Sequence, residues 1–219
     1  MMEKLPSLVA FGSLAHWPVP EQLHLLRKLL LHIASLRPIV QTLQEYLATL
    51  TTSLCSKDPT LNALTIESAA EDLKQWIEDG TNVASSNEQR NAMLMPMTII
   101  AQAVQYLSYL RQSESIDHVS VLKNVSTRGG IQGFCAGLLT AVAVASSRSE
   151  EEIGIHIATS IKLAFCIGVY VDHDQVQNGG PYSTLAVRWR EPKAMEDIEQ
   201  LLEEYSNVRH QCSQGVRDL

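Results

Sequence analysis

Hydrophobic residues recur at helical spacing along most of the chain. The first such segment begins near Glu21, after Pro18 and Pro20, and carries leucines three or four positions apart until it ends ahead of Pro38. This spacing places the apolar side chains on one face of a helix. Later segments repeat the pattern. We therefore predict a second helix that ends at Asp58–Pro59. Further helices are predicted over Ile66–Asp79, Pro96–Arg111, Leu138–Ser146, Glu150–Tyr170 and Pro192–Tyr205.

Shorter apolar runs between the helices indicate strands. Leu8–Phe11 ends at Gly12, and Leu185–Trp189 follows the glycines and proline near residue 180. A third segment, Gly129–Gly133, leads into a turn around Cys135 and from there into a helix of small residues. Brief apolar runs bounded by glycine or proline are typical of buried strands.

Polar positions define the connections and one helix face. Thr81–Gln89 and the stretch before Gly129 are predicted to be loops, and so is Asp172–Asp174. Gln102 and Gln105 are expected on the polar face of the helix that ends near Arg111. An amphipathic helix turns such residues away from the core.

Composition and charge exclude several classes of protein. The chain has 219 residues, of which 45% are hydrophobic and 19% are charged, with a formal charge of -7. This length and composition favour a globular protein. A nucleic-acid surface is not expected, since phosphate binding requires clustered Lys and Arg. We see no secretion signal, and the apolar stretch Gly137–Ala145 is shorter than the roughly 20 residues that span a bilayer, so we expect a cytoplasmic protein without membrane contact.

The segment Gly133-Phe134-Cys135-Ala136-Gly137 contains the strongest chemical signal. It matches a nucleophile elbow, in which a strand, a sharp turn and a helix expose one reactive side chain, and the glycines allow strand and helix to approach closely. The helix N-terminus would favour a thiolate at Cys135, and the Ala136 N–H would stabilise an oxyanion. The alternative is that Cys135 is a small buried hydrophobe and that Gly133 and Gly137 serve helix packing alone.

The other cysteines and histidines define no second centre. Cys166 lies in an apolar helical segment and is expected in the core, and Cys55 and Cys212 have no assigned role. The chain has no Cys-x-x-Cys pair, so we expect reduced thiols, no zinc or other metal site and no disulfide framework. A cysteine nucleophile needs a base that is near in space, for which His16 and His173 are candidates.

Four features follow one another in a characteristic order: Val9-Ala10-Phe11-Gly12-Ser13 with Trp17-Pro18, the leucine-rich helices, the segment 132–141 around Cys135, and Ile161–Asp172. In this order they resemble the starter-unit acyl-carrier-protein transacylase domain at the N-terminus of fungal non-reducing polyketide synthases. The specific part is the elbow, with cysteine in place of the serine of malonyl transferases. The resemblance predicts a starter-acyltransferase-like domain over residues 1–205 and a polar tail over 206–219.

The resemblance implies an α/β fold of the malonyl-transferase type, a helix-rich core similar to that of α/β-hydrolases. In that family a ferredoxin-like subdomain and a closing segment with the catalytic histidine follow the core. This chain stops at Leu219, about where the subdomain should begin, so both are expected to be largely absent and the domain incomplete at its C-terminus. The family's second oxyanion donor is a backbone N–H just after the first strand, which corresponds to Ser13.

The implied reaction is acyl transfer in fungal aromatic polyketide biosynthesis. Cys135 would take an acyl group from acyl-coenzyme A or an acyl carrier protein and pass it to the phosphopantetheine of a carrier domain, with no bound cofactor. Other polyketide synthase domains, or a partner fatty-acid or reducing polyketide synthase, are expected partners. Residues 162–170 contain no arginine, which fits an uncharged starter. Two alternatives remain: a catalytically impaired remnant that only docks carrier proteins, and a cysteine thioesterase or hydrolase.

Overall fold

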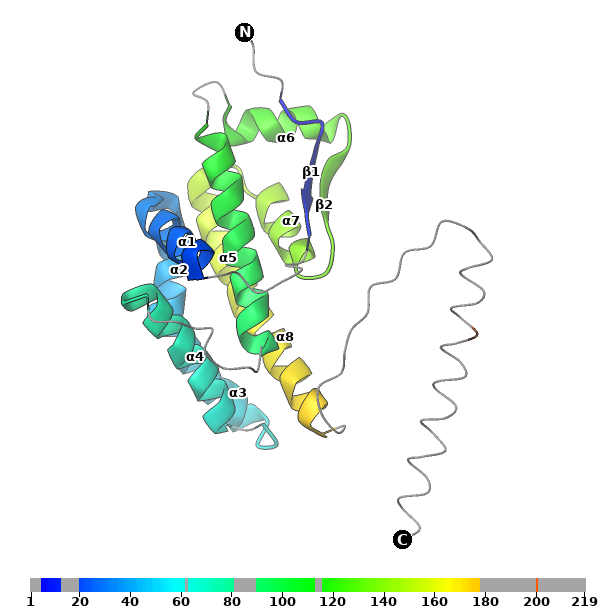
Figure 1. Cartoon of the computed structure of the whole chain (residues 1–219). Helices are drawn as coiled ribbons and strands as arrows, with labels where there is room; N and C mark the ends of the chain where they lie inside the picture. The colour runs from blue at the N-terminus through cyan, green and yellow to red at the C-terminus, as the bar shows by residue number, and fades with distance from the viewer. Residues whose placement is uncertain are drawn as a thin grey trace. The chain divides into compact units, whose positions relative to one another are not determined.

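The computed structural model describes residues 5–12, 20–61, 63–80, 90–112, 116–177 and 200. The chain divides into two compact units, Met1–Gly180 and Pro181–Leu219. Apart from Gln200, every described residue belongs to the first unit (Figure 1). The predicted strand Leu185–Trp189, the predicted boundary at residue 205 and the predicted loop Thr81–Gln89 lie outside the described residues, as does the predicted helix Pro192–Tyr205 except for Gln200.

The first unit is rich in helices and contains a small parallel sheet, which is compatible with the expected α/β class. Its elements in chain order are β1 (Leu8–Phe11), α1 (Pro20–His32), η1 (Ala34–Leu36), α2 (Arg37–Gln41), η2 (Thr42–Tyr46), α3 (Leu47–Lys57), α4 (Ala63–Glu78), α5 (Asn91–Leu110), α6 (His118–Ser126), β2 (Gly130–Gly133), α7 (Gly137–Ala145) and α8 (Glu150–Gln177).

The long helices α5 and α8 pack against each other and form the centre of this unit (Figure 1). Met97, Ile100 and Leu107 of α5 are fully buried, as are Ile161 and Phe165 of α8. A helix that is apolar around most of its circumference belongs in a core. The Glu150–Asp174 part of α8 is also long and apolar enough to cross a membrane by length and composition alone, although half of its most apolar stretch is buried within the unit.

Strands β1 and β2 confirm the two strands predicted before Gly12 and before Cys135. They pair in parallel, with Leu8 opposite Gly130 and Phe11 opposite Gly133. Parallel strands require a long crossover, which helices α1 to α6 provide. Because parallel strands end at the same edge of a sheet, Gly12 and the turn at Cys135 come to lie side by side.

Helix α5 begins at Asn91, whereas the sequence predicted a start near Pro96. The cause is a cap from a distant helix. The Asp172 carboxylate accepts hydrogen bonds from the backbone N–H of Asn91 at 2.8 Å and of Ala92 at 2.9 Å. The first N–H groups of a helix need such partners. Asp172 itself is part of α8, so the loop predicted over Asp172–Asp174 was wrong.

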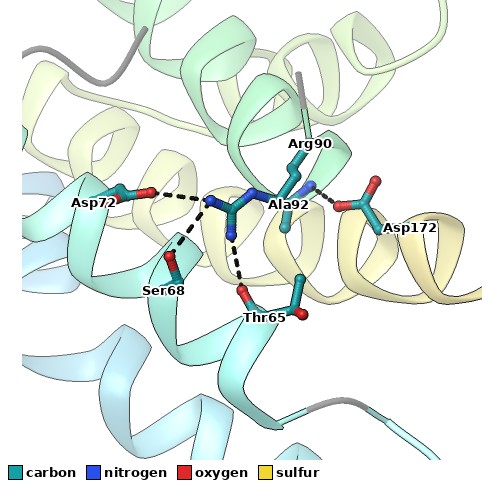
Figure 2. A network of polar contacts seen from close by, with 6 residues as sticks. All are labelled: Thr65, Ser68, Asp72, Arg90, Ala92 and Asp172. Atoms are coloured by element: carbon teal, nitrogen blue, oxygen red, sulfur yellow. Dashed lines mark hydrogen bonds and ion pairs between the residues drawn. The ribbon is translucent and has the colours of Figure 1, made fainter. Parts of the chain in front are cut away.

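Arg90 ties the start of α5 to α4 (Figure 2). Its guanidinium donates to the Thr65 carbonyl at 3.0 Å and to the Asp72 carboxylate at 3.3 Å. Since Asp172 caps the same helix start from α8, the beginning of α5 is the point at which three helices are fastened together.

Helix α6 replaces part of the polar connection predicted before Gly129. Asp117 caps it by accepting the Ser120 N–H at 2.9 Å. The next residue, His118, is buried between the Tyr106 hydroxyl, 2.8 Å from Nδ1, and the Ser147 carbonyl, 3.0 Å from Nε2. A carbonyl only accepts, so Nε2 carries the proton and Nδ1 accepts from Tyr106. The ring therefore joins α5, α6 and the connection from α7 to α8.

We expect Asp172→Ala to lower the free energy of unfolding by about 1–2 kcal/mol, because the N–H groups that begin α5 lose their acceptor. Urea unfolding followed by circular dichroism measures the loss. Glu67→Ala, at an exposed position of α4, is the control and should change stability little. Equal stability of both variants would show that the cap from α8 does not hold α5.

Because Tyr106 is buried, we expect the free energy of unfolding to fall at alkaline pH. Burial raises the pKa of its hydroxyl above the ordinary 10.0, so folding favours the protonated tyrosine. This contribution is present below about pH 10 and is lost as the pH rises further. Tyr106→Phe should cost about 1–3 kcal/mol at neutral pH, since buried His118 loses a partner, and should make the alkaline decline shallower.

Urea unfolding at several pH values above and below 10 tests this expectation. The exposed Tyr46 on η2 provides the control, and Tyr46→Phe should retain the steep decline of the unaltered chain. An unchanged decline in Tyr106→Phe would contradict the assignment to Tyr106.

Candidate functional site

Cys135 occupies the turn between β2 and α7. Its φ of 55° lies in the left-handed region. Among the residues that the structure describes, no other non-glycine residue has a positive φ. This conformation is strained for a residue with a side chain and persists only where the surroundings enforce it. The Cys135 side chain is exposed. The alternative of a small buried hydrophobe therefore does not describe this cysteine.

Hydrogen bonds fix the turn to the end of β1. The Phe134 N–H donates to the Phe11 carbonyl at 2.9 Å, which extends the strand pairing by one residue. The Gly137 N–H then donates to the Phe134 carbonyl at 3.0 Å, and the Leu138 N–H donates to the Cys135 carbonyl at 3.0 Å. The chain thus reverses within a single tight turn, with the Cys135 side chain on its outside.

Both glycines of the motif are required by backbone contacts. A Cβ atom at Gly133 would lie 2.4 Å from the Gly137 carbonyl oxygen, and a Cβ atom at Gly137 would lie 2.2 Å from the Phe11 carbonyl oxygen. Real Cβ atoms do not approach backbone this closely. The spacing of glycines predicted from the sequence therefore brings the N-terminus of α7 into direct contact with β1.

The N-terminus of α7 supplies the groups expected to stabilise negative charge. Ala136 is its N-cap residue. The N–H groups of the following residues, Gly137 to Leu139, already donate to carbonyls of the turn, so the Ala136 N–H is the expected donor here. The helix dipole adds a partial positive charge at this end. Ser13, the other predicted donor, and His16, a predicted base, lie outside the described residues.

The structure does not bring His173 to the Cys135 turn. The Ser160 hydroxyl donates to the Leu139 carbonyl at 3.3 Å, which places this level of α8 beside the first turn of α7. His173 is thirteen residues further along α8, roughly 20 Å at the helical rise. His156 binds the Ser147 hydroxyl at 2.9 Å, beyond the opposite end of α7.

The surroundings of the Cys135 turn are apolar. Phe134 in the turn is exposed, and so are Leu138 and Val142 of α7, whose spacing of four residues places them on one face of that helix. Cys166 differs from Cys135, because it is half-buried and burial raises the pKa of its thiol. The described residues contain no cluster of three side chains that could hold a metal ion.

Gln102 is a part of the site that the sequence did not reveal. It was expected on the polar face of α5 together with Gln105. Gln105 is exposed, but Gln102 is 7% exposed and binds the Gly12 carbonyl and the Thr140 hydroxyl. The available signal was its position as a single amide within the apolar run Ile99–Val104.

We expect Gly137→Ala to lower the free energy of unfolding by about 1–3 kcal/mol, because the added methyl group collides with the Phe11 carbonyl. Helix propensity alone would predict a gain of about 1 kcal/mol from the same change. Gly12→Ala is the control, since nothing lies within 4 Å of a Cβ there. Urea unfolding separates the two explanations, and a stabilised Gly137→Ala would refute the close approach.

Comparison with known proteins gives a consistent result. The family described as starter unit:ACP transacylase in aflatoxin biosynthesis matches residues 21–213. Methylphloroacetophenone synthase of Cladonia uncialis is 44% identical over 218 residues, 98% of this chain and 8% of that protein. The 5-methylorsellinic acid synthase of Aspergillus terreus is 33% identical over 93% of this chain and 8% of its own length.

A third relative, non-reducing polyketide synthase Preu3 of Preussia isomera, is 32% identical over 93% of this chain. The chain spans 8% of the length of each of these three synthases. The match of the family model covers most of the chain and includes the turn at Cys135. This chain belongs to the starter unit:ACP transacylase family of fungal non-reducing polyketide synthases.

Proposed function

We propose that this chain transfers a starter acyl group in polyketide biosynthesis and that Cys135 carries the acyl group as a thioester. One observation supports this role most directly: Cys135 is exposed, in a strained left-handed turn, between a strand and a helix N-terminus. Strain of this kind is retained where it serves a function. Family membership supports acyl transfer as the reaction class.

The reaction proceeds in two half-reactions of the same type. The Cys135 thiolate attacks the carbonyl carbon of an acyl thioester; a C–S bond forms and the C=O electron pair moves to oxygen. The Ala136 N–H, in the turn beside Cys135, and the α7 dipole stabilise this oxyanion. Collapse expels the donor thiolate, which takes up a proton. The phosphopantetheine thiol of a carrier protein then attacks the Cys135 thioester, loses its proton, and releases Cys135.

The character of the surface favours an uncharged starter. The exposed side chains nearest Cys135 in the turn and on α7, Phe134 and Leu138, are apolar. An apolar surface binds hydrocarbon and leaves a carboxylate without a partner. Acetyl and longer alkanoyl groups are therefore the proposed starters.

The proposal includes the malonyl-transferase type of α/β fold. The parallel pair β1–β2, with α7 leaving directly from the turn after β2, supports this architecture. It also includes carrier domains as partners, since several relatives are polyketide synthases by name. The reaction is assigned to the cytoplasm, where the thiol stays reduced.

Incubation with acetyl- and hexanoyl-coenzyme A, followed by intact-mass measurement, tests the proposal. We expect one acyl adduct on the unaltered chain and its complete loss in Cys135→Ala. Cys166→Ala is the matched control, and it should keep the adduct because the half-buried thiol on α8 is less reactive.

Two results would change the assignment, and a third would complete it. No adduct on the unaltered chain would leave docking of carrier proteins without turnover as the function. Rapid release of free acid would identify a thioesterase. Transfer of the adduct to a phosphopantetheinylated carrier protein, with loss of the mass from Cys135, would complete the transacylase cycle.

A further inference from the structure

Gln102 contacts two chain segments beside the Cys135 turn, namely the end of β1 and helix α7. Its side-chain N–H donates to the carbonyl oxygen of Gly12, directly after β1, and its side-chain oxygen accepts from the hydroxyl of Thr140 on α7. Thr140 is 0% exposed and Gln102 is 7% exposed. One buried amide on α5 therefore connects β1 and α7 close to the point where they meet.

Packing alone does not explain a glutamine at this position. Its neighbours on α5, Ala101 and Ala103, are buried and apolar, and so are Ile99 and Ile100. A buried amide is costly unless it is fully paired, and an apolar side chain of similar shape is often as stable or more stable. The hydrogen bonds of Gln102 therefore point to a role in placing the groups that it binds.

The carbonyl that Gln102 holds belongs to the peptide bond that leaves Gly12. This oxygen also lies against the start of α7, because a Cβ atom at Gly137 would be 3.1 Å from it.

We propose that Gln102 is a positioning residue for acylation of Cys135. By binding the Gly12 carbonyl and the Thr140 hydroxyl together, it aligns the peptide after β1 with the first turn of α7. The Ala136 N–H at the start of α7 is thereby held towards the oxyanion that forms when Cys135 attacks a thioester. This inference rests on the proposed function. Donors act on an oxyanion only when placed accurately, and an error of about 1 Å costs roughly 10²-fold in rate.

Two reactions of the same thiol separate positioning from general damage. Acylation by hexanoyl-coenzyme A passes through an oxyanion, whereas alkylation by iodoacetamide displaces iodide from a saturated carbon and forms none. In the full chain, Gln102→Ala should slow acylation of Cys135 about ten- to a hundredfold and leave the alkylation rate unchanged. Gln105→Ala, at an exposed position of the same helix, should change neither rate.

A second pair of variants decides the matter if Gln102→Ala does not fold. Thr140→Val removes the hydroxyl that binds Gln102 at nearly constant volume, and Thr140→Ser keeps it. Acylation should be slow in the valine variant and restored in the serine variant, again with alkylation unchanged. Equal loss in both reactions, or no loss of acylation, overturns the positioning role and leaves the proposed function intact. If the unaltered chain is not acylated, the proposed function fails and this inference fails with it.

Discussion

The contact between the start of α7 and the end of β1 is the constraint on which the site depends. At Gly137 the two backbones are so close that no side chain fits between them. This contact brings a helix N-terminus to the edge of a parallel strand pair, and the intervening turn has to accept a left-handed residue. The exposure of Cys135 follows from that geometry. The exposure and the strained conformation of Cys135 are thus caused by the backbone contact and not by the thiol itself.

The rest of the unit holds this contact in place through polar groups at the ends of its helices. Asp172 and Arg90 fasten the start of α5 to α8 and α4, and Gln102 then reaches from α5 to the end of β1 and to α7. His118 makes a comparable link to Tyr106, one turn further along α5. Since α5 and α8 form the core, the turn is attached to the least deformable part of the molecule. A mobile support would not keep a strained residue in one conformation.

The features that could be predicted from the sequence are those with local causes. Leu8–Phe11, the helix predicted over Ile66–Asp79, and the glycine spacing around Cys135 each have a pattern of neighbours that dictates them. The start of α5 was wrong because its cap, Asp172, lies on a helix far along the chain. Helix α6 was missed because its capping residue Asp117 stands in a polar stretch. Gln102 was misplaced for a similar reason: its partners belong to elements that only the fold brings together.

The parallel register of β1 and β2 has a consequence for the order of folding. Leu8 pairs with Gly130, more than a hundred residues further along the chain, so the strand pair closes a loop that contains helices α1 to α6. Closure of so long a loop is slow compared with the formation of local helices. The turn at Cys135 therefore takes shape after the helical core. The exposed thiol of Cys135 therefore reaches its final position after the helices have packed, and the nascent chain does not present it in this strained turn.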